Sequence, residues 1–262
     1  MALCGAGITN LHAKGPVGHI WRRPSILAQM SLMNDITESR KSARHAALMN
    51  RVYRGQKHIY DATRKYYLLG RDELIADLNP PESAHILELG CGTARNLMKA
   101  AETWPSAQLY GLDISSTMLK IARNKVTEKQ LDDRIALSEG DAEHPVICST
   151  ADDEKFDRIF LSFCLSMIPD WQSVIQQSIG LLRDDGELHI VDFGQSEKLP
   201  VMFRRLLMGW LAQFHVAPRR DLPPYLEKLE RELPIKVEFQ SLYRDYSWRF
   251  KIRRITDSTN VV

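Results

Sequence analysis

The segment Glu88-Leu-Gly-Cys-Gly-Thr-Ala94 decides the fold of this chain. It follows the apolar run Ala84–Leu89, which is typical of a short buried strand, and it precedes a helical pattern over Arg95–Glu102. Gly90 and Gly92 permit a sharp backbone bend and a close ligand approach that a side chain would block. A strand, a glycine-rich turn and a helix in this order predict the first βα unit of a ligand-binding sheet.

Short apolar strands alternate with helices beyond this turn, which predicts right-handed crossovers and a parallel sheet. The last two β-like runs are joined too tightly for a crossover helix and are therefore expected to be antiparallel. The predicted fold is α/β: a seven-stranded, mostly parallel sheet with a C-terminal antiparallel hairpin and helices on both faces. The expected strands are Ala84–Leu89, Gln108–Leu112, Ile135–Ser138, Phe156–Ser162, Glu187–Asp192, Lys236–Leu242 and Tyr246–Ile252; further helices are expected near Ser116–Lys125, Trp171–Leu182 and 200–214, the last followed by a loop containing Pro218, Pro223 and Pro224.

Acidic residues follow the first three strands in order: Glu88, then Asp113 about 20 residues after the glycines, then Asp141. A carboxylate at the second position can accept both hydroxyls of a ribose. Position 95, where a dinucleotide-binding loop has a glycine against a pyrophosphate, is arginine. S-adenosylmethionine (SAM) has no pyrophosphate; it has a sulfonium and a free amino group, which a nearby carboxylate suits. The three acids therefore predict a SAM site.

The glycine turn resembles motif I of class I SAM-dependent methyltransferases, acidic-x-Gly-x-Gly-x-Gly, with Ala94 in place of the last glycine. A methyl group there is expected to tighten the turn without abolishing binding. No Cys/His cluster has the spacing of metal ligands, so no metal is expected. The candidate SAM-binding residues are Glu88, Gly90, Cys91, Gly92, Thr93, Asn96, Asp113, Ile114, Met118, Asp141, Ala142 and Ser162.

Composition predicts a soluble globular protein with a sizeable core, because 44% of the 262 residues are hydrophobic and 26% are charged. The four cysteines form no CxxC pair, which favours a reducing, cytoplasmic setting. The sequence contains no run of 18 apolar residues, so no membrane span is predicted. The N-terminus also lacks the layout of a signal peptide.

Charge is distributed unevenly although the net charge is only +2. Residues 40–71 carry nine Lys/Arg and one acid, residues 72–200 carry 11 basic and 23 acidic groups, and residues 201–262 carry 12 basic and seven acidic groups. Two basic flanks around an acidic middle suggest an anionic partner, either a lipid surface or a nucleic acid.

Three segments are expected along the chain: a mobile extension over 1–35, a helical segment over 36–75 that covers the active site, and the SAM-binding domain over 76–262. Within the second segment, helical patterning runs from near Ser42 to Leu69, with Gly70 as its C-cap.

Tyr53, Tyr60 and Tyr67 recur every seven residues of this helical pattern, and a basic residue follows each of them four positions later. Both sets lie on roughly one helix face. Tyrosine rings can surround an ammonium, and guanidinium groups bind carboxylates, so the face suits a zwitterionic amine. The alternative is that the tyrosines contact the core and the basic groups are solvated. The three basic residues are Lys57, Arg64 and Arg71.

The run His58-Ile-Tyr-Asp-Ala-Thr-Arg-Lys-Tyr-Tyr-Leu-Leu-Gly-Arg-Asp72, together with motif I and Leu165-Ser-Met-Ile-Pro-Asp-Trp171, is similar to the bacterial diacylglyceryl-homoserine N-methyltransferases of betaine-lipid synthesis. The resemblance covers about residues 40–254. It implies three successive methylations of a lipid-linked homoserine amine, which yield diacylglyceryl-N,N,N-trimethylhomoserine and S-adenosylhomocysteine. The tyrosine run is far more specific than motif I, which marks only the superfamily.

Candidate catalytic residues follow from this chemistry. An amine is its own nucleophile, so methyl transfer needs alignment and desolvation more than a strong base. The ammonium proton must still leave, and Tyr60, Tyr66, Tyr67 or a water chain can take it. The homoserine carboxylate would pair with Arg64 or Arg71.

A diacylglycerol acceptor stays in the bilayer, so the enzyme is expected to dock on the cytoplasmic face of an anionic membrane without crossing it. The basic segment 40–71 and the apolar helix 200–214, with Arg204 and Arg205, are the candidate contacts. For the helix, a core-packed lid is an equal alternative. An aminocarboxypropyl transferase, which would make the homoserine lipid, is the expected functional partner.

Two other functions remain open on sequence: methylation of another small molecule or lipid, such as phosphatidylethanolamine or a quinone precursor, and RNA binding with incidental SAM binding. Leu161–Trp171, which borders the acceptor pocket in this fold, lacks the Asn/Asp-Pro-Pro-Tyr/Phe motif of DNA amino-methyltransferases. No RNP-type strand appears either, so no nucleic-acid partner is expected. Cys164 is expected to be a small core residue and not a nucleophile.

Overall fold

The computed structural model describes residues 44, 46–47, 68–147, 155–214 and 216–255. All of them belong to the unit Ser42–Val262 of the chain. Tyr60, Arg64, Tyr66 and Tyr67 lie outside the described residues, as do the basic face around them and the extension 1–35, so these predictions remain as they stand.

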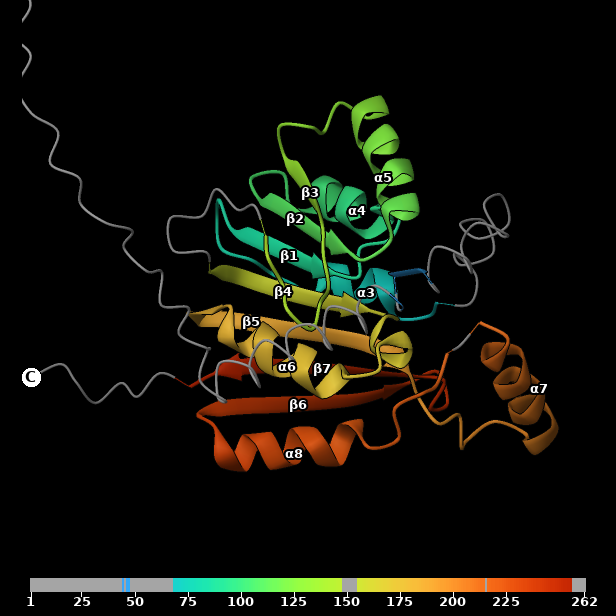
Figure 1. The fold of residues 1–262 in the computed structure, drawn as a ribbon. Coiled ribbons are helices and arrows are strands. Elements are labelled where there is room, and N and C mark those ends of the chain that lie inside the picture. Colours follow the sequence, from blue (N-terminus) through green and yellow to red (C-terminus); the bar gives the residue numbers. More distant parts are fainter. Residues whose placement is uncertain (1–43, 45, 48–67, 148–154, 215, 256–262) are drawn as a thin grey trace, which may run out of the picture. The chain divides into compact units, whose positions relative to one another are not determined.

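The centre of the fold is a seven-stranded sheet in the order β3-β2-β1-β4-β5-β7-β6 (Figure 1). Strands β1 to β5 pair in parallel, and β7 runs antiparallel to both β5 and β6. This confirms the predicted mixed sheet with its C-terminal hairpin. The strands are β1 His85–Leu89, β2 Gln108–Asp113, β3 Ile135–Glu139, β4 Phe156–Ser162, β5 Leu182–Phe193, β6 Ile235–Leu242 and β7 Ser247–Arg254.

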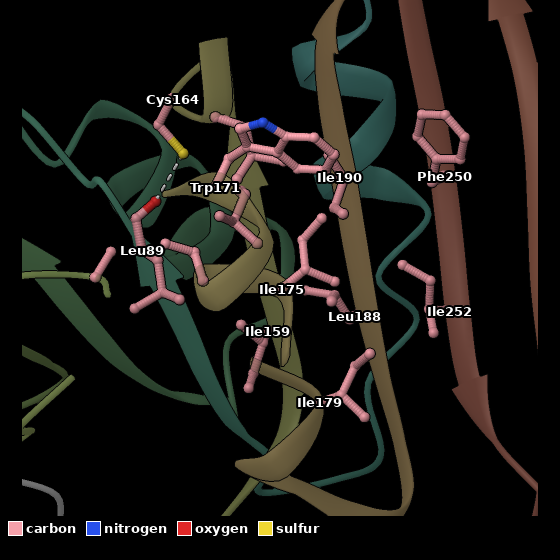
Figure 2. Close-up of a cluster of buried hydrophobic side chains, with 14 of the residues drawn as sticks. Leu89, Ile159, Cys164, Trp171, Ile175, Ile179, Leu188, Ile190, Phe250 and Ile252 are labelled. Carbon is pink, nitrogen blue, oxygen red and sulfur yellow. Dashed lines mark hydrogen bonds between the residues drawn. The ribbon is translucent and has the colours of Figure 1, made fainter. Parts of the chain in front are cut away.

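Helices cover both faces of the sheet, and each face has its own hydrophobic cluster. On one face, Trp171 and Ile175 of α6 pack on the strands (Figure 2). Leu226 of α8 belongs to the same cluster. On the other, Leu74 of α3 and Leu97 of α4 lie in the second cluster, together with side chains of α5 and α7. The helices are α3 Arg71–Ala76, α4 Arg95–Thr103, α5 Ser116–Glu128, the 3-10 turn η1 Leu165–Met167, α6 Trp171–Gly180, α7 Val201–Ala212 and α8 Leu222–Glu232.

The Pro-rich loop predicted after α7 is wrong over its second half, which forms α8. Pro223 and Pro224 lie in the first turn of that helix. The first amides of a helix have no intrahelical acceptor, so proline costs no hydrogen bond there. The prolines mark a helix start and not a break.

The predicted helix end at Leu69, with Gly70 as C-cap, is also wrong. Leu68 and Leu69 are not helical, and the carbonyl of Leu69 accepts a hydrogen bond from Ser247 Oγ at 2.9 Å. Gly70 adopts a left-handed backbone (φ 95°) at the N-cap of a new helix, α3. Contact with β7 therefore fixes the chain path here, and a local helical pattern does not reveal such a contact.

Candidate functional site

The glycine loop, Glu88–Ala94, connects β1 to α4 at the carboxyl edge of the sheet. Its turn is held against β2, because the amides of Gly90 and Cys91 both donate to Leu112 O, at 2.8 and 3.0 Å. Gly90 and Gly92 have positive φ angles of 73° and 54°. A Cβ at Gly90 would lie 2.8 Å from Cys164 Cβ, whereas a Cβ at Gly92 would meet nothing within 4 Å. The first glycine is therefore needed for packing, and the second leaves open space.

Ala94 also adopts a left-handed backbone, with φ 58° and ψ 20°, as the N-cap of α4. Its methyl group is fully buried. Non-glycine residues pay about 1 kcal/mol or more for this conformation. The third position of the motif thus requires the backbone that glycine adopts freely, and alanine here stores strain in the turn.

Asp113 joins the glycine loop to the end of β2. Its Oδ2 accepts from the Gly92 amide at 2.7 Å, and its Oδ1 accepts from the Ser115 amide at 2.8 Å. The carboxylate is nearly buried and lies at the wall of a cleft. Two backbone donors hold this negative charge in one orientation, which suits recognition of paired hydroxyls.

Glu88 is fully buried behind the loop. Asn96 Nδ2 donates to its Oε1 at 2.6 Å, while Oε2 has no hydrogen-bond partner among the described residues. Burial raises the pKa of this carboxyl to about 8, against the opposing hydrogen bond from Asn96 and the charge of Arg71. A neighbouring positive charge favours the ionised form of a buried carboxyl. The expected ligand carries such a charge.

A cleft opens where β1, β2, β3 and β4 end. It brings together seven of the predicted residues from four separate strand ends. Ser162 Oγ is buried in its wall without a partner among the described residues, and Asp141 Oδ1 accepts from the Glu143 amide at 3.0 Å. The predicted residues that line the cleft are Gly90, Gly92, Asp113, Ile114, Asp141, Ala142 and Ser162.

Five other predicted residues do not line this cleft: Glu88, Cys91, Thr93, Asn96 and Met118. Cys91 is buried in the second hydrophobic cluster, where burial raises the pKa of its thiol well above the usual value. The Met118 side chain is also buried, and its amide donates to the N-cap Ser115 Oγ at 3.3 Å. Asn96 acts on Glu88 as described above. Cys91 therefore packs behind the cleft, and Asn96 orients the Glu88 carboxyl there.

The remaining lining comes from the wall loop, Phe163–Ile168, and from Leu112 and Gly140. Within the wall loop, Met167 and Ile168 were not singled out from the sequence, although they lie in the stretch expected to border the acceptor. Gly140 was missed as well; its position directly before Asp141 was the available signal. The wall that they form is largely apolar.

Cys164 is a buried core residue of the wall loop, as the sequence suggested. Its thiol donates to Leu89 O at 3.4 Å (Figure 2), and burial raises the pKa of the thiol well above its usual value. A thiol that stays protonated is a poor nucleophile.

Long-range polar contacts hold the wall loop. Asp192, at the end of β5, accepts from the Ser166 amide at 3.0 Å, and burial raises the pKa of this carboxyl. Arg219 donates to Leu165 O at 3.0 Å and to Ile168 O at 2.5 Å, and the Ala217 amide donates to Ser166 O at 2.9 Å. The connection between α7 and α8 therefore positions one wall of the cleft.

Arg71, the first residue of α3, is the one predicted acceptor-binding cation that lies within the described residues. It is buried, and its positive charge opposes the rise that burial causes in the pKa of Glu88. Its guanidinium therefore acts electrostatically on the first residue of the glycine loop. Among the described residues, no cluster of His, Cys, Asp or Glu is arranged to hold a metal ion, and no helix is long and apolar enough to cross a membrane.

A family model described as "Methyltransferase domain" matches residues 81–226, which is more than half of the chain. Among curated proteins, the demethylmenaquinone methyltransferase of Listeria monocytogenes serotype 4a (strain HCC23) is 28% identical over 186 residues, covering 70% of this chain and 68% of the relative. The enzyme of that name from Geobacillus sp. (strain WCH70) is 25% identical over 211 residues, covering 78% and 84%.

Solved structures share the fold at low sequence identity. The plantazolicin methyltransferase BpumL, in complex with a substrate analogue and S-adenosylhomocysteine, has a TM-score of 0.59 at 13% identity and covers 83% of this chain and 99% of its own. The phosphoethanolamine N-methyltransferase 2 of Haemonchus contortus, in complex with SAM, has a TM-score of 0.55 at 15% identity and covers 71% and 52%.

Proposed function

The chain belongs to the methyltransferase domain family and is a class I SAM-dependent methyltransferase, and from this premise we propose that it methylates the amine of a lipid-linked homoserine head group. The proposed reaction consists of three successive transfers that end in diacylglyceryl-N,N,N-trimethylhomoserine. The sequence run His58–Asp72 carries the choice of homoserine, because it is similar to enzymes of betaine-lipid synthesis.

The donor side of the proposal uses the residues at the strand ends. Asp113 would accept the ribose hydroxyls, Asp141 would lie by the adenine amino group, and Ser162 and the glycine turn would contact the amino-acid part. Two features of the cleft fit this ligand: the open space at Gly92 and the unpartnered Ser162 Oγ. SAM supplies a methyl group on a sulfonium, already activated for displacement.

The ionisable side chains of the cleft carry the choice of an amine. Among the described residues that line it, only Asp113, Asp141 and Cys164 ionise. Asp113 accepts from two backbone amides, Asp141 accepts from the Glu143 amide, and burial raises the pKa of the Cys164 thiol. Such a lining suits an amine better than a carbon or hydroxyl nucleophile, which needs a base to activate it. An amine is its own nucleophile, so it needs only loss of its proton, alignment and desolvation.

The apolar wall contributes the desolvation. Phe163, Met167 and Ile168 face the cleft, and water excluded by such side chains cannot solvate the attacking nitrogen. The tyrosine residues Tyr60, Tyr66 and Tyr67 remain the proposed proton acceptors, and Arg64 or Arg71 the partner of the homoserine carboxylate. An aminocarboxypropyl transferase would supply the substrate, and the reaction would take place at the cytoplasmic membrane face.

A quinone precursor is the second candidate acceptor, because curated relatives at 28% identity are named demethylmenaquinone methyltransferase. The same donor site would serve it, and an apolar wall suits its ring. Phosphatidylethanolamine is a third acceptor, with an amine but no carboxylate beside it. The chain belongs to a methyltransferase family, in which SAM is the methyl donor. This argues against the alternative of RNA binding in which SAM binding is incidental.

Labelled SAM distinguishes these acceptors when the purified enzyme is given diacylglyceryl-homoserine, phosphatidylethanolamine and a demethylated quinol in separate but matched micelles. We expect label in the homoserine lipid at an initial rate at least about tenfold above the other two, with no label from an Asp113→Ala variant. Label only in the quinol would overturn the homoserine proposal and select the second candidate.

A further inference from the structure

Helix α7 leaves large apolar side chains in solvent. Val201, Met202, Phe203 and Leu206 are 57%, 78%, 54% and 69% exposed, although each is of a type that folding normally buries. The other side of the helix is anchored, because Leu211 is fully buried in the second hydrophobic cluster. The helix is thus fixed to the fold and still presents an apolar face outward, which marks an interaction surface.

The charges around this face have one sign. Residues 198–220 contain five Lys/Arg and no Asp or Glu. Arg205 is exposed beside Leu206, and neither Arg204 nor Arg205 makes an ion pair within the part of the chain that the structure describes. An apolar face flanked by unpaired cations is the composition of helices that lie in the interface of an anionic bilayer.

We propose that α7 is the membrane-docking helix of this enzyme. Its exposed apolar face inserts into an anionic lipid surface; the face consists of Val201, Met202, Phe203 and Leu206. The occupant is a bilayer and not a second copy of the chain. A symmetric pairing of α7 with itself would bring Arg204 and Arg205 of both copies together, and the helix has no acid to neutralise them.

The place of α7 in the fold gives this docking a consequence for the reaction. Figure 1 shows α7 beyond the end of the sheet at which β5 ends. The connection that follows it reaches the wall loop through Ala217 and Arg219, and Met167 and Ile168 of that loop line the cleft. When α7 is docked, the wall loop, and with it one side of the cleft, therefore lies close to the lipid surface. This holds for any lipophilic acceptor and so does not depend on the choice of homoserine.

Vesicle sedimentation of the full chain, without acceptor, tests the proposal. We expect the wild type to bind vesicles of phosphatidylcholine with phosphatidylglycerol more tightly than phosphatidylcholine alone, with affinity that falls as salt is added. Met202→Asp with Leu206→Asp should weaken binding to the anionic vesicles by about tenfold or more. Arg204→Glu with Arg205→Glu should weaken it by a similar factor and remove the preference for phosphatidylglycerol.

The matched control is Lys228→Glu with Arg231→Glu on α8, which makes the same change of charge on another surface helix and should leave vesicle binding within about twofold. SAM affinity, measured by calorimetry, should be unchanged in all three variants and so report intact folding. The proposal would be overturned if the wild-type protein did not bind anionic vesicles. It would also be overturned if the α7 variants bound them as tightly as the wild type does. A dimer of the wild type in solution that is lost in the Met202→Asp, Leu206→Asp double variant would also overturn it.

Discussion

The glycine loop and the wall loop face the same cleft but are held in different ways. In the glycine loop, contacts between neighbouring strand ends suffice: Asp113 binds the Gly92 amide, and Leu112 O binds the Gly90 amide. In the wall loop, the anchors come from far along the chain, with Asp192 bound to Ser166 and Arg219 bound to Leu165. The first arrangement serves a ligand that is common to the whole family. The second makes the position of the wall loop depend on β5 and on the connection between α7 and α8.

The strongest test of the glycine loop is the titration of Glu88. Its folded-state pKa is raised to about 8 by burial. The folded chain therefore holds a proton that the unfolded chain has lost, and stability falls as pH rises from the unfolded pKa through the folded one. We expect roughly 3 kcal/mol of lost stability between about pH 6 and pH 9 in urea unfolding without SAM.

Glu88→Gln should remove most of this slope, since a neutral amide has no proton to lose. Glu102→Gln, an exposed acid on α4, is the control and should leave the fall between pH 6 and pH 9 in place. A Glu88→Gln protein with the wild-type pH dependence would show that this carboxyl is ionised in the folded state.

The next largest effect is expected at Asp113. Asp113→Ala removes an acceptor shared by two backbone amides and the proposed ribose contact, so SAM affinity should fall by about 100-fold or more. Isothermal titration measures it. Asp132→Ala deletes an exposed acid that accepts a hydrogen bond from Thr127 Oγ1, and this variant should retain wild-type affinity. Equal affinities for the two variants would remove Asp113 from the donor site.

The two glycines should separate stability from binding. Gly90→Ala places a Cβ 2.8 Å from Cys164 Cβ and should cost about 2–3 kcal/mol of unfolding free energy. Gly92→Ala meets no atom within 4 Å, so it should cost only about 1 kcal/mol of backbone strain. Because Gly92 lines the cleft, the added methyl group should cost more free energy of SAM binding than free energy of unfolding. The reverse ranking would place the cofactor elsewhere.

At the wall loop, Arg219→Met should act on the acceptor alone. It removes the hydrogen bonds to Leu165 O and Ile168 O, and we expect the KM for the acceptor to rise by about tenfold while the SAM dissociation constant stays constant. Arg220→Met is the neighbouring control, because its guanidinium contacts the side chain of Gln195 and not the loop. A parallel loss of SAM affinity would show that the two loops are not independent.

The smallest expected effect is a gain. Ala94→Gly relieves a left-handed backbone at φ 58°, which should stabilise the protein by about 1 kcal/mol or less. The same substitution at Ala100, a buried helical residue of α4, should destabilise it by about 1 kcal/mol or more. Unfolding midpoints in urea compare the pair, and a loss at both positions would contradict the strain at Ala94.

The contrast between the loops also explains what the sequence could predict. The succession of strands and helices along the chain follows from short-range patterns, and so do the residues around the glycine loop, because each acid stands at its own strand end. Arg219 lies 54 residues from Leu165, and no periodicity joins them. Helix α8 was missed because its prolines occupy the first turn, where they are tolerated. Glu88 and Asn96 were identified, but only the fold shows that they bind each other behind the cleft.

The central claim is that the enzyme transfers the SAM methyl group to the amine of a lipid head group. The most direct measurement is carbon NMR of the lipid extract after incubation of the enzyme with [methyl-13C]SAM and micelles holding both diacylglyceryl-homoserine and a demethylated quinol. We expect one dominant enriched signal, from methyl groups on a quaternary nitrogen. An enriched methyl group on a ring carbon, with none on nitrogen, would contradict it.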